Sequence, residues 1–178
     1  MLSHLPLNQI SMMTSQQEIK NDNKVDVLIV GFGAVGILYG WVLEQSSKVR
    51  VTALARSNYN KVKNEGVRLE SSKFGKHNWK PHRVIKDIDE VKDVNFKYII
   101  CTFKHLPDVN PTQDILGKSL QQTKCFVLLQ NGLGIEEPLQ SVVKEACIIS
   151  GAIWVGANLR EENRVIHNDL VGFLVYNK

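Results

Sequence analysis

A glycine-rich turn joins a predicted strand to a predicted helix near the start of the chain. The apolar, β-branched run Val25–Val30 is typical of a buried strand, and Ala34–Gln45 is apolar nearly all round, which predicts a buried helix. Between them, Gly31-Phe32-Gly33-Ala34-Val35-Gly36 has the spacing GxGxxG. In this context the first glycine permits a tight turn, the second lets the backbone approach a pyrophosphate, and the third lets the helix pack on the strand. The helix start also attracts phosphate. We predict a dinucleotide-binding loop; a purely structural turn is the alternative.

Strands and helices alternate along the rest of the chain, which favours the α/β class. We expect a Rossmann-type, doubly wound, mostly parallel sheet with helices on both faces, forming one domain over residues 25–178. Further predicted strands are Val49–Ala55, two hairpin arms at Val67–Ser72 and His77–His82, and Tyr98–Thr102, Cys125–Leu129, Ile148–Val155, Arg164–His167 and Gly172–Tyr176; further helices are a short one from Ser57 or Asn58 to Asn64, then Asp87–Asp93, Thr112–Gln122 and Ile135–Glu145.

Composition argues against two other kinds of binding partner. The formal net charge of the 178 residues is only +4, and the lysines are scattered without a basic stripe, so we expect no nucleic-acid binding. Val27–Leu43 lacks charges and contains a GxxxG at Gly36 and Gly40, which a membrane helix could also explain. The run is shorter than the roughly 20 residues that a span needs. Its first part also resembles a strand, so we expect no membrane segment.

The first 24 residues differ in composition from the rest. Met1–Lys24 is rich in Gln, Asn and Ser, has no arginine, and lacks an apolar stretch long enough for a signal peptide. It predicts a disordered tail and a cytoplasmic location. The three cysteines, Cys101, Cys125 and Cys147, show no CxxC spacing and lie in or beside apolar runs. We expect buried, reduced thiols and no metal site.

The end of the second strand bears on the choice of cofactor. Many NAD-binding domains place an acidic residue there for the ribose hydroxyls, whereas an arginine suits the 2′-phosphate of NADP. Here the strand ends in Leu54-Ala55-Arg56-Ser57, and the first acidic residue after it is Glu65. Arg56 therefore predicts NADP(H); a solvated arginine with no ligand is the alternative.

Two further polar residues follow strands at the edge where open parallel sheets bind ligands. Lys104 follows Tyr98–Thr102, and Asn131 begins a turn after Cys125–Leu129. A lysine there can neutralise a carboxylate or bind a ribose, and an asparagine can both donate and accept hydrogen bonds. A solvated lysine and an ordinary Asn-Gly turn are the alternatives.

Taken together, these residues resemble the N-terminal domain of the ketopantoate reductase (2-dehydropantoate 2-reductase) family. The resemblance covers about residue 25 to the end. It rests on the glycine loop, Arg56, Lys104, and Leu129-Gln130-Asn131-Gly132-Leu133-Gly134 followed by Glu136 and Glu137. It implies that the enzyme uses NADPH to reduce the ketone of 2-dehydropantoate in pantothenate biosynthesis.

The resemblance also assigns roles to residues. It implies that Lys104 and Asn131 line the nicotinamide end and the small 2-keto acid substrate, and that Ala157 lies near the cofactor. Val165-Ile166-His167 matches a family strand, whereas Asn163 and Asp169 stand where the family more often has glycine.

In the family the general acid is a lysine of a helical C-terminal domain that also covers the cleft. We therefore expect the chain to be the cofactor-binding half of such a reductase, inactive alone. A catalytically silent NADPH-binding sensor or partner module is the alternative.

Overall fold

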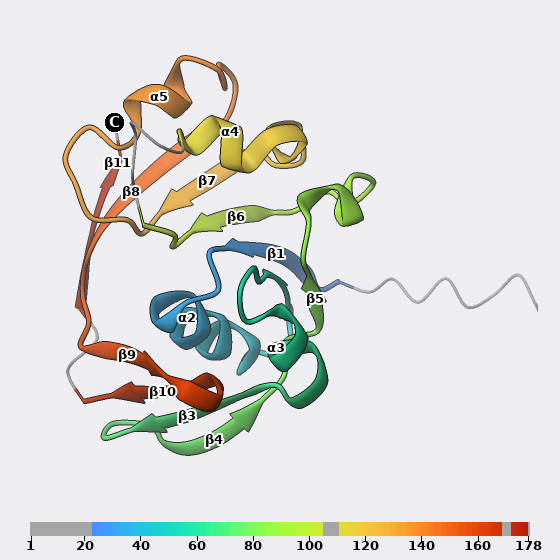
Figure 1. Ribbon diagram of the computed structural model, residues 1–178. Coiled ribbons are helices and arrows are strands. Elements are labelled where there is room, and N and C mark those ends of the chain that lie inside the picture. Colours follow the sequence, from blue (N-terminus) through green and yellow to red (C-terminus); the bar gives the residue numbers. More distant parts are fainter. Residues whose placement is uncertain (1–22, 105–110, 169–171, 178) are drawn as a thin grey trace, which may run out of the picture.

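The computed structural model describes residues 23–104, 111–168 and 172–177, and within them the strands form two sheets (Figure 1). The larger sheet comprises β1 (Val25–Val30), β2 (Val49–Leu54), β5 (Arg83–Ile85), β6 (Tyr98–Cys101), β7 (Cys125–Leu128), β8 (Cys147–Trp154) and β11 (Gly172–Asn177). Its order is β11-β8-β7-β6-β1-β2-β5, and every neighbouring pair is parallel except β11 and β8. The predicted α/β Rossmann-type fold is confirmed.

A second, four-stranded sheet packs against the helix that follows the glycine loop. It comprises β3 (Val67–Ser71), β4 (Gly75–Trp79), β9 (Ala157–Arg160) and β10 (Arg164–His167), in the order β4-β3-β10-β9. Helix α2 (Ala34–Glu44) lies between this sheet and the larger one (Figure 1). The helix is therefore covered by strands on two opposite sides, which explains why it is apolar nearly all round.

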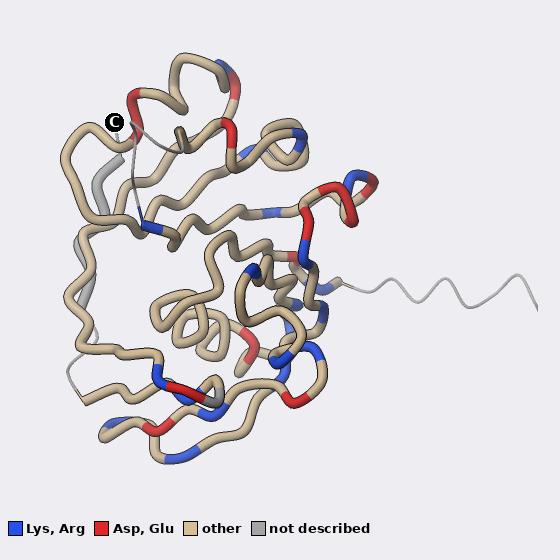
Figure 2. The backbone as a smooth tube through the Cα atoms, in the orientation of Figure 1, with Lys and Arg blue, Asp and Glu red and all other residues tan. Residues whose placement is uncertain are grey.

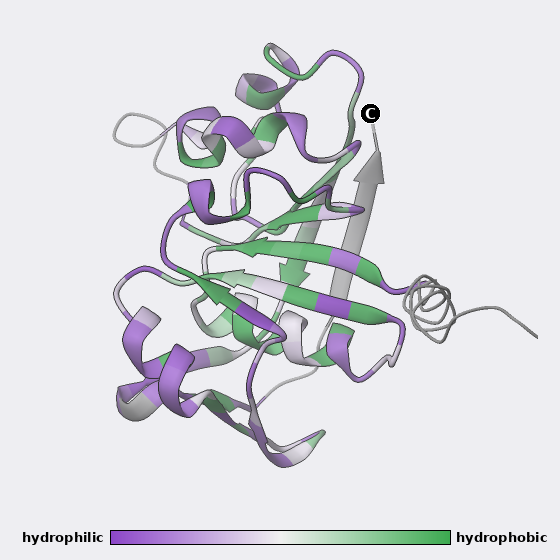
Figure 3. Cartoon of the chain, turned by 90° about the vertical axis from the view of Figure 1, so that its right-hand side faces the viewer, coloured by the Kyte–Doolittle hydropathy of each residue, from purple (hydrophilic) through white to green (hydrophobic). Residues whose placement is uncertain are grey.

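The opposite face of the larger sheet is covered by short helices. These are α4 (Thr112–Leu116), α5 (Glu137–Gln140) and the 3₁₀ turns η1 (Ile88–Val91) and η2 (Gly117–Gln121), while α3 (Tyr59–Glu65) lies on the α2 side (Figure 1). Alternate residues of β1 point into two cores: Val27 and Ile29 face α2, and Leu28 and Val30 face α4 and α5. A strand buried on both faces is typical of a parallel sheet. Figure 3 shows hydrophobic residues along these strands and hydrophilic residues on the outer helices and loops.

Three predicted helices are shorter than expected. The one predicted at Asp87–Asp93 is only the four-residue 3₁₀ turn Ile88–Val91. The helix predicted at Thr112–Gln122 changes to a 3₁₀ turn at Gly117, whose φ of +47° is a left-handed conformation that interrupts an α-helix. The helix predicted at Ile135–Glu145 is regular only over Glu137–Gln140. The last two segments are anchored by buried leucines, Leu116 and Leu139, so packing rather than helix length holds them on the sheet.

Two short strands were not predicted, and one hairpin turn lies earlier than expected. β5 has three residues and β9 has four; β5 pairs with β2, and β9 pairs with β10, so the position of each depends on tertiary neighbours and neither has a strong local signal. β4 begins at Gly75, not His77. The reason is local, because the Ser71 hydroxyl accepts hydrogen bonds from the backbone N–H groups of Lys73 (3.1 Å) and Phe74 (3.0 Å), which closes the turn early.

The uncharged run that could suggest a membrane span divides into a strand and a helix. Residues 27–30 belong to β1, and α2 has only 11 residues. In the described part of the chain, every helix is too short or too polar to cross a bilayer. Figure 2 shows Lys and Arg interspersed with Asp and Glu over the described backbone. The predicted tail Met1–Lys24 lies outside the described residues, apart from Asn23 and Lys24.

The expectation of three buried thiols is wrong for two of them. Cys101 is fully buried in β6, but Cys125 is half-buried and Cys147 is exposed. The last two are the first residues of β7 and β8, where the strands emerge from the core. An apolar run therefore predicts a strand better than it predicts the burial of the strand's first residue.

A single carboxylate connects α2 to both sheets. One Glu44 oxygen accepts hydrogen bonds from the backbone N–H groups of Val51 (2.6 Å) and His82 (3.1 Å), and the other accepts one from Trp79 Nε1 (2.9 Å). Glu44 is only half-buried, so when its carboxylate is removed, water can accept some of the three hydrogen bonds in its place.

We expect Glu44→Ala to lower the free energy of unfolding by about 2–3 kcal/mol, because hydrogen bonds to a charged group contribute about 1.5–3 kcal/mol and three donors lose their acceptor. Thermal unfolding followed by circular dichroism measures the loss. The matched control is Glu65→Ala, which removes an exposed carboxylate at the end of α3. Equal melting temperatures for the two variants would show that the Glu44 carboxylate does not hold these elements together.

Candidate functional site

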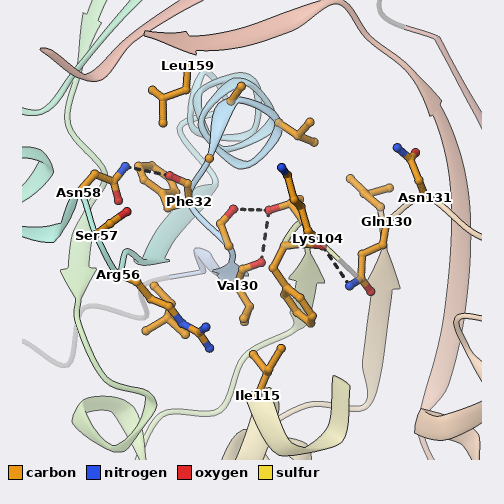
Figure 4. A pocket seen from close by; sticks show the side chains of 18 of the residues that line it. Val30, Phe32, Arg56, Ser57, Asn58, Lys104, Ile115, Gln130, Asn131 and Leu159 are labelled. Carbon is orange, nitrogen blue, oxygen red and sulfur yellow. Dashed lines mark hydrogen bonds between the residues drawn. The ribbon is translucent and has the colours of Figure 1, made fainter. Parts of the chain in front are cut away.

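A groove of about 660 Å³ lies past the carboxyl ends of β1, β2, β6 and β7. Open parallel sheets bind their ligands at this edge. Figure 4 shows side chains from the glycine loop, from the segments after β2, β6 and β7, and from β9 pointing into it. The lining residues are Val30, Gly31, Phe32, Gly33, Ala34, Val35, Leu54, Arg56, Ser57, Asn58, Thr102, Phe103, Lys104, Ile115, Leu129, Gln130, Asn131, Ile153 and Leu159.

Two glycines of the loop are required by the fold itself. Gly31 has a φ of +99°, and a Cβ there would collide with the backbone of Phe103. A Cβ on Gly36 would approach Thr102 Oγ1 to 2.8 Å and would also collide with the carbonyl oxygen of Gly31. That carbonyl accepts a 2.5 Å hydrogen bond from the Thr102 hydroxyl. The glycine turn, the start of α2 and the segment after β6 therefore lie so close together that there is no room for a side chain at Gly31 or Gly36.

Gly33 differs from the other two glycines, because nothing in the described part of the chain requires a glycine there. A Cβ at this position meets no atom of the described residues within 4 Å, and its φ of −90° suits any residue. Gly33 is also the N-cap of α2, and no side chain caps the helix. The first N–H groups of α2 are therefore open toward the groove, where an anion can accept hydrogen bonds from them.

One end of the groove carries Arg56, Ser57 and Asn58, directly after β2 (Figure 4). Asn58 Nδ2 donates a 3.0 Å hydrogen bond to the carbonyl oxygen of Phe32, which fixes this segment beside the glycine loop. Arg56 and Ser57 are exposed. Among the described residues, the groove lining includes two cations, Arg56 and Lys104, and no Asp or Glu, so this lining favours an anionic ligand.

The other end carries Gln130 and Asn131, with Lys104 between the two ends (Figure 4). Gln130 Nε2 donates a 3.1 Å hydrogen bond to the carbonyl oxygen of Phe103, which connects the segments after β6 and β7. Gln130 is 5% exposed, and its Oε1 has no hydrogen-bond partner among the described residues. Lys104 and Asn131 are both exposed.

The structure brings nearly all the predicted site residues into one groove. Residues 31–35, Arg56, Lys104 and Asn131 line it, and Gly36 lies close to two lining residues, Gly31 and Thr102. Ala157 is not a lining residue; it packs in β9 against the core around α2, two residues from Leu159, which does line the groove.

Several lining residues carried little sequence signal. The sequence indicates Ser57 and Asn58 only as alternative starts of a short helix, and Gln130 only as part of a motif. Thr102 is predicted as the last residue of a strand, but its hydroxyl donates a hydrogen bond to the carbonyl oxygen of Gly31 in the glycine loop. A polar residue within four residues of the end of a buried strand is the signal that each of them carries.

Residues 27–176 match the family model described as ketopantoate reductase PanE/ApbA. The chain belongs to the ketopantoate reductase family. A curated 2-dehydropantoate 2-reductase from Nostoc sp. is 28% identical over 149 residues, which are 83% of this chain and 44% of the relative. A meiotically up-regulated gene 72 protein from Schizosaccharomyces pombe is 28% identical over 135 residues, 74% of this chain and 24% of the relative.

Solved structures share the fold. The 2-dehydropantoate 2-reductase from Methylococcus capsulatus superposes with a TM-score of 0.78 at 23% identity, covering 86% of this chain and 48% of that one. A ternary structure of D-mandelate dehydrogenase with NADH and anilino(oxo)acetate superposes with a TM-score of 0.70 at 20% identity, with the same coverage of both chains. The chain therefore spans less than half the length of each of these four proteins.

Proposed function

We propose that the groove binds a nicotinamide dinucleotide, with its pyrophosphate at the start of α2. The observation that carries this proposal is Gly33, where a side chain has free space on the protein side and would project into the groove. A glycine that the fold does not need, at an uncapped helix start, fits a ligand that approaches the backbone. The adenosine end then lies toward Arg56 and the nicotinamide toward Lys104 and Asn131.

We propose further that the cofactor is NADPH. Arg56 is exposed just past the end of β2 and lines the groove, and none of the described lining residues is a carboxylate that would repel a 2′-phosphate. NADH is the alternative, since the structure of D-mandelate dehydrogenase, which has the same fold, holds NADH. On this chain, the position of Arg56 just past the end of β2 favours NADPH over NADH.

Replacing Arg56 by alanine tests the choice of cofactor. We expect the NADPH affinity of Arg56→Ala to fall about tenfold to a hundredfold, because a charge-assisted contact to the 2′-phosphate is lost. The NADH affinity should change little. Fluorescence titration with both cofactors measures the ratio, and Arg160→Ala, which removes an exposed arginine outside the groove lining, is the control. Equal affinity of the parent chain for NADH and NADPH would refute the assignment.

The reaction that this groove supports best is reduction of a small 2-keto acid, in this family 2-dehydropantoate on the route to pantothenate. The bound nicotinamide supplies the hydride. Lys104 is an exposed cation between the two ends of the groove, able to hold the substrate carboxylate beside the nicotinamide, and Asn131 offers an amide that can both donate and accept hydrogen bonds. Gln130 holds the two segments together through its hydrogen bond to Phe103. We propose that the general acid comes from outside these 178 residues, so the chain acts as the cofactor-binding half.

The test of this function is oxidation of NADPH with 2-dehydropantoate by a protein in which this chain is completed by a family C-terminal domain. We expect Lys104→Ala and Asn131→Ala in that protein to lower kcat/KM, because both side chains are proposed to contact the substrate beside the nicotinamide. Activity equal to the parent in both variants would refute their placement at the substrate.

A further inference from the structure

Two of the three cysteines lie side by side at the start of adjacent parallel strands. Cys125 is the first residue of β7, Cys147 is the first residue of β8, and the two are register partners. Neighbouring strands lie about 4.8 Å apart, and the Cα atoms of disulfide-bonded cysteines are usually about 4.4–6.8 Å apart. Aligned residues of neighbouring strands also point to the same face. The backbone therefore already holds this pair at a separation that a disulfide can bridge.

The three thiols have very different access to solvent. Cys147 is exposed, Cys125 is half-buried beside it, and Cys101 is buried in β6. Burial raises the pKa of Cys125 to about 11, and the neighbouring Cys147 thiol adds to this rise. Burial alone raises the pKa of Cys101 to about 12. Because the thiolate is the reactive form and must be reached from solvent, Cys147 is the thiol that an oxidant meets first.

We propose that Cys125 and Cys147 form a reversible dithiol, which a small disulfide such as oxidised glutathione converts to an intramolecular disulfide. The Cys147 thiolate attacks one sulfur of the reagent, forming a mixed disulfide and releasing one glutathione thiol. Cys125 then attacks the Cys147 sulfur and releases the second glutathione. Two protein thiols are oxidised, one glutathione disulfide is reduced, and the two thiol protons end on the two glutathiones.

The disulfide would close the segment that forms one end of the groove. Between the two cysteines lie the rest of β7, the turn with Gln130 and Asn131, and α5. Both sulfurs sit at the strand starts, at the opposite end of the strands from the groove, so the bond would tie this segment without touching the cofactor site. Cys147 N donates to the carbonyl oxygen of Lys124 (2.8 Å), so the pair lies at the first rung of the β7–β8 ladder, where the backbone can adjust.

The experiment treats the fully reduced chain with oxidised glutathione and counts free thiols after denaturation. We expect the count to fall from three to one, since only Cys101 stays reduced, and peptide mapping should find Cys125 joined to Cys147. The oxidised chain should melt about 5–15 °C above the reduced chain, because the bond restricts the unfolded state. A glutathione retained on Cys147, a dimer linked through Cys147, three unchanged thiols or an unchanged melting temperature would each contradict the proposal.

Two variants separate the two steps. Cys125→Ser should stop at a mixed disulfide, with glutathione retained on Cys147. Cys147→Ser should keep both remaining thiols, because Cys125 is half-buried and Cys101 is inaccessible. Loss of a thiol in Cys147→Ser would show that Cys125 reacts first and would overturn the proposed order.

Discussion

Replacing Gly33 by valine should abolish dinucleotide binding while leaving the fold intact. The backbone at Gly33 has a φ of −90°, which valine adopts without strain, and an added Cβ meets no atom of residues 23–104, 111–168 or 172–177 within 4 Å. The branched side chain would instead occupy the space over the start of α2, where the pyrophosphate is proposed to bind. Calorimetry should show binding heat for the parent chain and none for Gly33→Val. The melting temperatures should differ only by the small effect of valine at an N-cap.

Two other substitutions make this result specific. Gly33→Ala adds only a methyl group in the same open space, so it should weaken binding less than valine does. Gly31→Ala should lower the melting temperature instead, because Gly31 has a φ of +99° and its Cβ would collide with the Phe103 backbone. A folded Gly33→Val chain with the parent's affinity would mean that the glycine loop has only a structural role.

The parts of the fold that the sequence predicts well are those with a strong local pattern. The βαβ unit around the glycine loop has an apolar strand, a turn that needs glycine and a buried helix, and the structure places each boundary within a residue. The four-stranded sheet is different, because β3 and β10 are neighbours although about 100 residues separate them. No local pattern encodes that pairing. The only sign of it was that α2 is apolar on the side that a single sheet would leave uncovered.

The candidate site also contains residues with a local sequence signal and residues whose roles depend on tertiary packing. Arg56, Lys104 and Asn131 were predicted because each follows a buried strand, and parallel strands bring their carboxyl ends to one edge. Gln130 and Thr102 act through hydrogen bonds to the backbone of other segments, so their roles depend on tertiary packing. The sequence does not predict that Cys125 and Cys147 are neighbours, because the register of β7 and β8 is fixed only in the folded sheet.

Assayed alone, these 178 residues should reduce 2-dehydropantoate at least about 100-fold more slowly than a full-length 2-dehydropantoate 2-reductase. Hydride transfer builds negative charge on the ketone oxygen, which needs a proton or a positive charge nearby. Of the described residues that line the groove, Lys104 and Arg56 are the cations, and Arg56 lies at the end away from Asn131. A missing general acid costs about 10²–10⁴ in rate, and an open cleft loses substrate positioning as well.

The measurement is steady-state oxidation of NADPH at saturating 2-dehydropantoate, after calorimetry has shown that the chain binds NADPH. Binding without turnover is the expected outcome. Turnover within about tenfold of the reference enzyme would refute the proposal that the acid lies elsewhere, because the smallest loss expected from a missing acid is larger than that. Lys104 would then be the first candidate, since it is the cation nearest the nicotinamide end. Lys104→Ala would decide the point: if Lys104 is the proton donor, kcat should fall while NADPH affinity changes little.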